Sequence, residues 1–217
     1  MKVRSLGELE DLLDKDLAWR RKEFTTLKLM VGASRKHEKT ILMRASVAML
    51  YAHWEGHIKF CAQVYLLYLK HVAPSYKQMT DNFVQMSLSE KFKQGFSIKR
   101  FSSQQEIFNY LTQERDEKFD VDESVVIDTE SNLKYEVVFN ILGQLGLDTS
   151  IYELKEHFIN SKLLKCRNAI AHGERLNELE LEDAHSELET ELLTMIETFQ
   201  NLVRNAAENK LYLKKAS

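Results

Sequence analysis

The 217-residue sequence predicts an all-α protein, an antiparallel bundle of four to five main helices. Proline occurs once, at Pro74, and glycine only seven times, which disfavours a β-sandwich because that fold needs many tight turns. Apolar residues recur instead at intervals of three and four over long stretches, the spacing of helices with one buried face. We expect a single domain that spans residues 1–217.

The first two expected helices are long. The first begins at Ser5, because Glu8 stands three residues later and completes a capping box. A polar stretch over residues 32–38 then predicts a bend or short loop. The second helix is expected from about Thr40 to Val72, and Pro74 ends it because a proline pushes the preceding residue out of the α region.

The middle third, residues 75–148, changes character and is interpreted as a partly helical insertion between the second helix and the next long one. Helical pieces are expected over residues 104–115, where Ser103 and Glu106 form a second capping box, and over residues 132–145. The acidic stretch between these pieces is expected to be mostly loop.

Two further helices complete the expected bundle. One runs from about Ser150 to Ala171, and Gly173 follows as a C-terminal stop because glycine tolerates the left-handed conformation. The last runs from about Asn177 to Asn209, with one apolar stripe and an acidic opposite face.

Charge limits the modes of nucleic-acid binding. A net charge of −3 excludes a broad basic coat, so any nucleic acid must be held by a local patch. Basic residues cluster in three places: Arg20, Arg21 and Lys22; Lys91, Lys93, Lys99 and Arg100; and Lys162, Lys165, Arg167 and Arg175. The alternative for each cluster is a solvated helix face.

The N-terminus has no apolar core and predicts no secretory signal. Charged and histidine residues interrupt the apolar stretch Ile41–Leu69, so it predicts a buried helix and not a membrane span. Cys61 and Cys166 both lie in apolar helical contexts and are expected to be reduced core residues. We therefore expect a cytoplasmic protein without membrane contact.

Metal and cofactor chemistry finds little support in the sequence. His53 and His57 stand four residues apart, but they form H-x-E-x-H and not the zinc-protease H-E-x-x-H, and no third ligand cluster is visible. Satisfied core or interface histidines are the favoured interpretation. The sequence also has no glycine-rich phosphate loop. From these observations together we expect neither a metal nor a cofactor.

The end of the helix that precedes Gly173 carries the candidate chemistry. Asn168 and His172 are four residues apart and share a face, and Arg167 lies beside that face. Arginine binds phosphate through a planar fork, and histidine transfers protons near neutrality. Together they provide a phosphate clamp and a proton shuttle for cleavage of an RNA phosphodiester without a metal. The alternative is a helix C-cap in which both cations favour the helix dipole.

Three polar residues of the second helix share one face. Arg44, Tyr51 and Glu55 fall on one stripe, because eleven residues are close to three helical turns. Arg44 and Glu55 are expected to pair with each other or with groups on a neighbouring helix, and a buried structural ion pair is an equal alternative.

The string Arg167-Asn168-Ala169-Ile170-Ala171-His172-Gly173 resembles the R-x4-6-H signature of the HEPN superfamily (higher eukaryotes and prokaryotes nucleotide-binding domains). In the ribonuclease branch of that superfamily the residue after the arginine is often asparagine. Residues 50–59 and 17–23 resemble two further blocks of one bacterial HEPN subgroup, so the resemblance spans nearly the whole chain apart from its middle third.

The resemblance implies a metal-independent RNA endonuclease whose two copies face each other across a cleft. Carried over to this chain, Arg167 and His172 are the catalytic pair and Asn168 supports them. Arg44, Tyr51 and Glu55 of the second helix would lie near the cleft as further supporting groups. Attack of the 2′-hydroxyl on the adjacent phosphate would leave a 2′,3′-cyclic phosphate. Lys162, Lys165 and Arg175 are the expected RNA-binding residues.

Implied partners are RNA, a second copy of the chain, and an antitoxin or defence-system protein, since many such ribonucleases are toxins or phage-defence factors. The acidic face of the last helix could be a docking surface for such a protein, or a merely solvated face. Two alternatives stay open. One is a non-catalytic HEPN module that binds nucleotide or protein, and the other is a helical bundle without a site.

Overall fold

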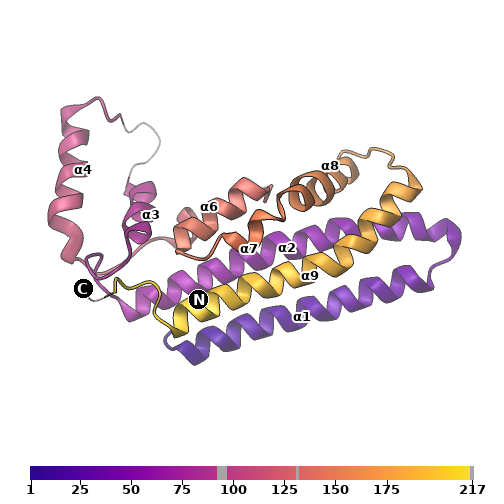
Figure 1. Ribbon diagram of the computed structural model, residues 1–217, viewed down its shortest axis with the longest axis horizontal. Coiled ribbons are helices and arrows are strands. Elements are labelled where there is room, and N and C mark those ends of the chain that lie inside the picture. The colour runs from indigo at the N-terminus through magenta and orange to yellow at the C-terminus, as the bar shows by residue number, and fades with distance from the viewer. Residues whose placement is uncertain (92–96, 131, 216–217) are drawn as a thin grey trace.

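The computed structural model describes residues 1–91, 97–130 and 132–215. Three long helices, α1 (Leu6–Ala33), α2 (Lys36–Val72) and α9 (Glu178–Glu208), lie side by side and form the body of the molecule (Figure 1). Helix α2 is central, because it packs on α1, on α9 and on the short helix α8. In the described part of the chain the only β-pairing consists of isolated bridges, so the all-α prediction is confirmed.

The smaller elements are, in chain order, α3 (Asp81–Lys91), α4 (Phe101–Gln113), η1 (Glu114–Asp116), α5 (Glu123–Val126), α6 (Tyr135–Leu145), α7 (Ser150–Glu153), η2 (Phe158–Leu164) and α8 (Lys165–Ala171). Elements η2 and α8 pack along α2 and bring the candidate motif to its side. None of the described helices is both long enough and apolar enough to cross a membrane.

Helix α1 begins as the sequence predicted. The Ser5 hydroxyl accepts a hydrogen bond from the Glu8 N–H at 3.1 Å, and the Glu8 carboxylate accepts one from the Arg4 N–H at 2.7 Å. The predicted Ser5 cap is confirmed, but the reciprocal bond of a capping box is not formed, because Glu8 accepts from Arg4 and not from Ser5.

Helix α2 begins earlier than predicted, at Lys36. The Glu38 carboxylate accepts a hydrogen bond from the Arg35 N–H at 3.0 Å, so the connection to α1 shrinks to two residues. The predicted end at Val72 is confirmed, since Ala73 adopts a left-handed conformation (φ 50°) immediately before Pro74.

One continuous apolar core runs along the long helices. Helix α2 buries Leu50, Trp54, Ile58 and Tyr65 completely. The predicted apolar stripe of α9 faces it, with Leu181, Leu188, Leu192, Met195, Ile196, Phe199 and Val203 buried. Asn177 caps α9 by accepting the Leu179 N–H at 2.9 Å, as the predicted boundary requires.

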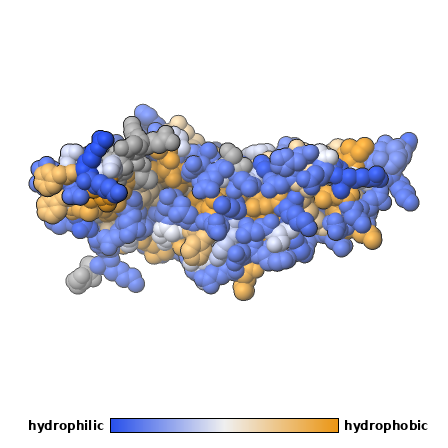
Figure 2. Space-filling view, turned by 90° about the horizontal axis from the view of Figure 1, so that it is seen from above, coloured by the Kyte–Doolittle hydropathy of each residue, from blue (hydrophilic) through white to orange (hydrophobic). Residues whose placement is uncertain are grey.

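The middle third contains the two expected helical pieces, as α4 and α6, together with the unpredicted helices α3 and α5. The second capping box is wrong, because Ser103 lies inside α4 and not before it. Helix α4 projects from the bundle near the C-terminus (Figure 1) and exposes Phe101 and Phe108. On the largely hydrophilic face in Figure 2, hydrophobic residues gather at that same end.

The predicted continuous helix from Ser150 to Ala171 is wrong. It divides into α7, the π-helical segment η2 and α8. In a π-helix the hydrogen bonds run from i to i+5, and such widened turns occur often at functional sites. Within η2 the Asn160 side chain accepts a hydrogen bond from the Tyr135 N–H at 3.0 Å, and so caps α6, whose own N-cap residue makes no capping hydrogen bond with its side chain.

Candidate functional site

The helix that carries the motif ends in a tight turn. Gly173 is left-handed (φ 76°), the Gly173 N–H donates to Ile170 O at 3.1 Å, and the Glu174 N–H donates to Ala169 O at 2.8 Å. This pair of bonds is a Schellman motif, which confirms the predicted stop at Gly173. His172 is the last residue before the turn and is exposed. Within the described ranges, no hydrogen bond or ion pair engages its imidazole.

Arg167 is half-buried and lies against α2. Its Cζ atom is 4.6 Å from the centroid of the Tyr51 ring, and its Nη1 donates to Asn168 Oδ1 at 2.8 Å. Asn168 is therefore in direct contact with Arg167, and its supporting role in catalysis stays a prediction. The structure brings Tyr51, a residue of the predicted stripe on α2, into contact with the motif.

The Tyr51 hydroxyl is held from two sides. It accepts a hydrogen bond from the Leu133 N–H at 2.7 Å, and it interacts with the Glu55 carboxylate. Burial raises the pKa of Tyr51 to about 12; the Leu133 hydrogen bond opposes this rise and Glu55 adds to it. Tyr51 therefore stays neutral, and its hydroxyl remains a donor for Glu55.

Arg44 does not pair with Glu55. Its Nη1 donates to Glu174 O at 2.7 Å, in the connection between α8 and α9. No ion pair joins Arg44 to Glu55 in the parts of the chain that the structure describes, so the interpretation as an ion pair within the stripe is wrong. Arg44 instead contacts the connection between two helices, where it braces the turn that follows His172.

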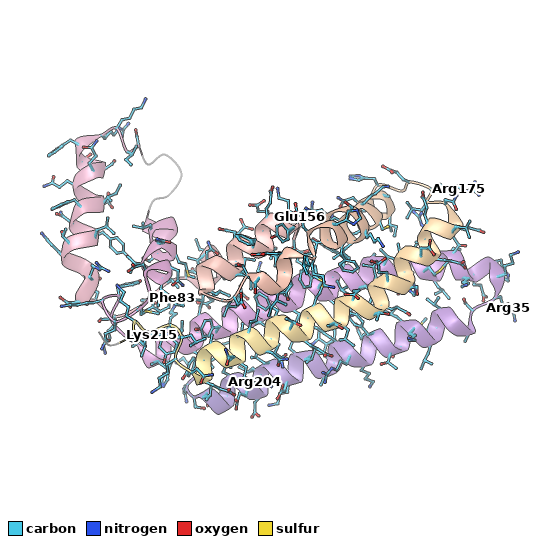
Figure 3. The ribbon with its side chains drawn as sticks, viewed as in Figure 1. Arg35, Phe83, Glu156, Arg175, Arg204 and Lys215 are labelled. Carbon is cyan, nitrogen blue, oxygen red and sulfur yellow. The ribbon has the colours of Figure 1, made fainter. Side chains whose placement is uncertain are left out.

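The predicted RNA-binding cations differ in their surroundings. Lys165 and Arg175 are exposed, and Figure 3 shows Arg175 near the start of α9. Lys162 instead forms an ion pair with Glu187 of α9, which offsets its charge. RNA binding by these three residues stays a prediction, with Lys165 and Arg175 the stronger candidates.

The other two basic clusters do not reach the motif. Arg20 is buried against Asp16 and Arg21 pairs with Glu197, so the run Arg20–Lys22 is not a basic patch. Lys99 and Arg100 lie just before α4, at the opposite end of the molecule from α8 (Figure 1). Lys93 is outside the described residues, and so is the side chain of Lys91.

A buried polar network joins α1 to α2, and sequence reasoning missed it. His57 Nδ1 is 2.5 Å from Asp16 Oδ2, and Arg20 Nε donates to the same oxygen at 2.6 Å. Arg20 Nη1 also donates to His53 O at 3.0 Å. The available signal was the i, i+4 spacing of Asp16 and Arg20 on the inner face of the first helix.

His53 and His57 are core residues, as the sequence favoured: they are 4% and 0% exposed. No group of three or more potential metal ligands occurs among the residues that the structure covers. Cys61 is buried, Cys166 is half-buried, and both are free thiols.

The comparisons place this architecture in a family. A family model described as RiboL-PSP-HEPN matches residues 15–208, which is most of the chain. The chain belongs to the HEPN superfamily. No curated protein and no solved structure matches it. The matched range includes all three blocks that resemble HEPN sequences, and the HEPN bundle holds the Arg167–His172 motif beside α2. The protein is therefore a module of the HEPN nuclease and nucleotide-binding class.

Proposed function

We propose that this HEPN protein is a metal-independent RNA endonuclease. The observation that carries the proposal is the state of the motif itself. Tyr51 and Asn168 brace Arg167, and His172 is exposed at the end of α8. Among the residues that the structure describes, no carboxylate pairs with Arg167 and no partner engages the His172 imidazole. A motif that served only as a helix cap would need neither the braced guanidinium nor the open imidazole, because Gly173 already terminates the helix.

The reaction assigns one role to each side chain. The imidazole of His172 in one copy accepts the proton of the 2′-hydroxyl, whose oxygen attacks the adjacent phosphorus. The bond from phosphorus to the 5′-oxygen breaks, and the imidazolium of His172 in the second copy protonates that oxygen. The products are a 2′,3′-cyclic phosphate and a 5′-hydroxyl. Arg167 binds the phosphate oxygens, on which negative charge accumulates.

The proposal needs two copies, and α2 offers a surface for the second. The outer stripe of α2 is exposed and formed by small and apolar side chains, namely Ile41, Ala45, Ala48, Met49 and Ala52. Tyr51, which touches Arg167, lies along one edge of this stripe. Along the other edge runs an apolar groove of about 430 Å³ between α1 and α2, which Trp19, Leu27, Met30 and Met49 help to line. A second chain seated here would lie next to the motif.

This dimer surface can be tested by introducing a charge on it. Ala48→Glu is expected to convert a dimer to a monomer in light scattering and to lower cleavage with it, while the melting temperature stays close to wild type. Thr194→Glu, on the exposed face of α9, is the matched control and should leave both properties unchanged. A wild-type protein that is monomeric at all concentrations would contradict the dimer.

Catalysis is tested by incubating purified protein with RNA in EDTA. Cleavage should survive chelation and produce cyclic phosphate ends. His172→Ala should lower kcat about 10²–10⁴-fold, the usual contribution of general acid–base catalysis. Arg167→Ala should lower kcat about 10²–10³-fold, as removal of a transition-state donor does. His71→Ala, an exposed histidine near the far end of α2, is the control. Equal cleavage by wild type and His172→Ala would assign the activity to a contaminant.

We further propose a toxin or phage-defence role, because many ribonucleases of this superfamily serve in such systems. Expression of the wild-type chain should arrest growth of a bacterial host, and expression of His172→Ala to the same level should not. Tight nucleotide binding without RNA turnover, and without arrest, would instead identify a non-catalytic module.

A further inference from the structure

We infer that Tyr51 is a positioning residue for Arg167, whose aromatic ring fixes the plane of the guanidinium and whose hydroxyl ties that ring to the segment before α6. This inference rests on the proposed function, because the orientation of Arg167 matters for catalysis only if Arg167 binds phosphate. It assigns separate tasks to the two ends of one side chain, and those tasks can be tested separately.

The guanidinium carbon of Arg167 lies over the Tyr51 ring. The Arg167 Cζ lies 4.6 Å from the Tyr51 ring centroid, within the range of a cation–π contact. A guanidinium carries its five N–H donors in its plane, and phosphate is bound along the edge of that plane. A stacked cation–π contact leaves these in-plane donors free for phosphate, whereas a carboxylate partner would take two of them. Asn168 takes one Nη1 donor, so the remaining donors stay available.

The hydroxyl keeps the ring in place. Tyr51 is 3% exposed and accepts the Leu133 N–H at 2.7 Å, and Leu133 is itself fully buried. Burial, together with the neighbouring Glu55 carboxylate, keeps the pKa of the phenol far above neutrality. Glu55 therefore lies near the hydroxyl of Tyr51, whereas Arg167 contacts the Tyr51 ring.

Leu133 connects Tyr51 to a distant part of the chain. It belongs to the connection between α5 and α6, in the middle third of the chain. The ring that orients Arg167 is therefore anchored on one side by α2 and on the other by the middle third. The middle third thereby contributes one hydrogen bond that holds the Tyr51 side chain in place.

Two variants separate ring from hydroxyl. Tyr51→Phe keeps the ring, so kcat should stay within about threefold of wild type, while hydrogen exchange at the Leu133 amide accelerates because its acceptor is lost. Tyr51→Leu removes the ring and should lower kcat about tenfold with little change in KM, a loss of the size expected for one cation–π contact. Tyr68→Leu, a buried tyrosine farther along α2, controls for general loss of stability and should leave kcat unchanged.

A double-mutant cycle tests whether Tyr51 acts through Arg167. In an Arg167→Lys background the planar guanidinium is gone, so Tyr51→Leu should then have much less effect on kcat than it has in the wild type. Equal effects of Tyr51→Leu in both backgrounds would overturn the inference.

A spectroscopic measurement keeps this inference distinct from the proposed function. The side-chain proton signals of Arg167 should show an aromatic ring-current shift in wild type and in Tyr51→Phe, and should lose it in Tyr51→Leu. If these signals behave so but no variant cleaves RNA, the proposed function fails and the positioning stands. If Tyr51→Leu leaves the Arg167 signals unmoved, the positioning fails whatever the activity.

Discussion

His57 Nδ1 lies 2.5 Å from Asp16 Oδ2, and His57 Nε2 lies 3.2 Å from the Cys61 sulfur. A carboxylate, an imidazole and a thiol in this order resemble a nucleophile with its base and orienting group. Cys61 is fully buried, however, and burial raises the pKa of its thiol well above the ordinary value. The chain of contacts is therefore a structural device that joins α1 to α2.

Stability should depend on pH through the buried histidines. Burial lowers the pKa of His57 and of His53 below the ordinary 6.5, despite the neighbouring carboxylates. Below pH 6.5 these histidines bind protons in the unfolded chain but remain neutral in the folded chain. Their contribution to the free energy of unfolding is therefore complete above pH 6.5 and is lost as the pH falls further. Each such proton gives a slope of about 1.4 kcal/mol per pH unit.

Urea denaturation at pH values from 8 to 5 measures this slope. The free energy of unfolding should fall below pH 6.5, and His57→Asn should make the fall shallower. His71→Ala, which removes an exposed histidine, should leave the slope as it is. A free energy of unfolding that stays constant over this range would contradict the assignment.

Among the acidic residues, Asp16 should cause the largest loss in the free energy of unfolding when it is replaced. Burial alone would raise the pKa of Asp16, but hydrogen bonds from His57 and Arg20 outweigh it and lower the pKa to about 2. Asp16→Ala leaves the Arg20 guanidinium buried without its partner, which should cost about 3–5 kcal/mol. Asp14→Ala breaks an ion pair with Arg204 in which Asp14 is 62% exposed, and should cost less than about 1 kcal/mol. Similar losses from the two variants in thermal denaturation would argue against a structural network.

Gly56 and Gly143 should respond in opposite ways to alanine. A helical glycine replaced by alanine ordinarily gains about 0.5–1 kcal/mol, and Gly143 has nothing within 4 Å of the added carbon. At Gly56 the same carbon would lie 3.2 Å from two nitrogens of the buried Arg20. Gly56→Ala should therefore destabilise the protein, by about 1–3 kcal/mol as overpacking does. Stabilisation by Gly56→Ala would mean that Arg20 moves freely.

Gly173 should tolerate substitution poorly because its backbone is left-handed. At φ 76° an alanine side chain costs about 1–2 kcal/mol, whereas asparagine tolerates this region better. Gly173→Ala should lower the melting temperature and cleavage together, since the turn places His172, and Gly173→Asn should restore much of both. Cleavage that is unaffected by Gly173→Ala would show that the turn does not position the imidazole.

Much of the fold was predictable from local rules. The periodicity of apolar residues, together with Ser5, Pro74, Gly173 and Asn177, located one end of each of the three long helices and the end of the motif helix. These signals are local and depend on backbone chemistry that each residue carries with it.

The remainder depends on contacts that are distant in sequence. The π-helical segment η2 has the same apolar spacing as an α-helix, and its Asn160 contact with Tyr135 is a tertiary one. Arg20 stands in a run of cations, which predicts a solvated face. In the structure it is buried instead, in a network with Asp16 and His57. Tyr51 was placed on the correct stripe, but its contact with Arg167 depends on how α8 packs on α2.

The 37 residues of α2 extend over about 55 Å, at about 1.5 Å per residue. This one helix carries His53 and His57, which hold α1, and also Tyr51, which holds Arg167. A genetic selection for loss of function would therefore collect substitutions along the whole of α2 for two unrelated reasons. Cellular abundance would separate the two kinds of substitution. Changes at His57 should lower the amount of folded protein, whereas Tyr51→Leu should leave near-normal amounts of an inactive protein.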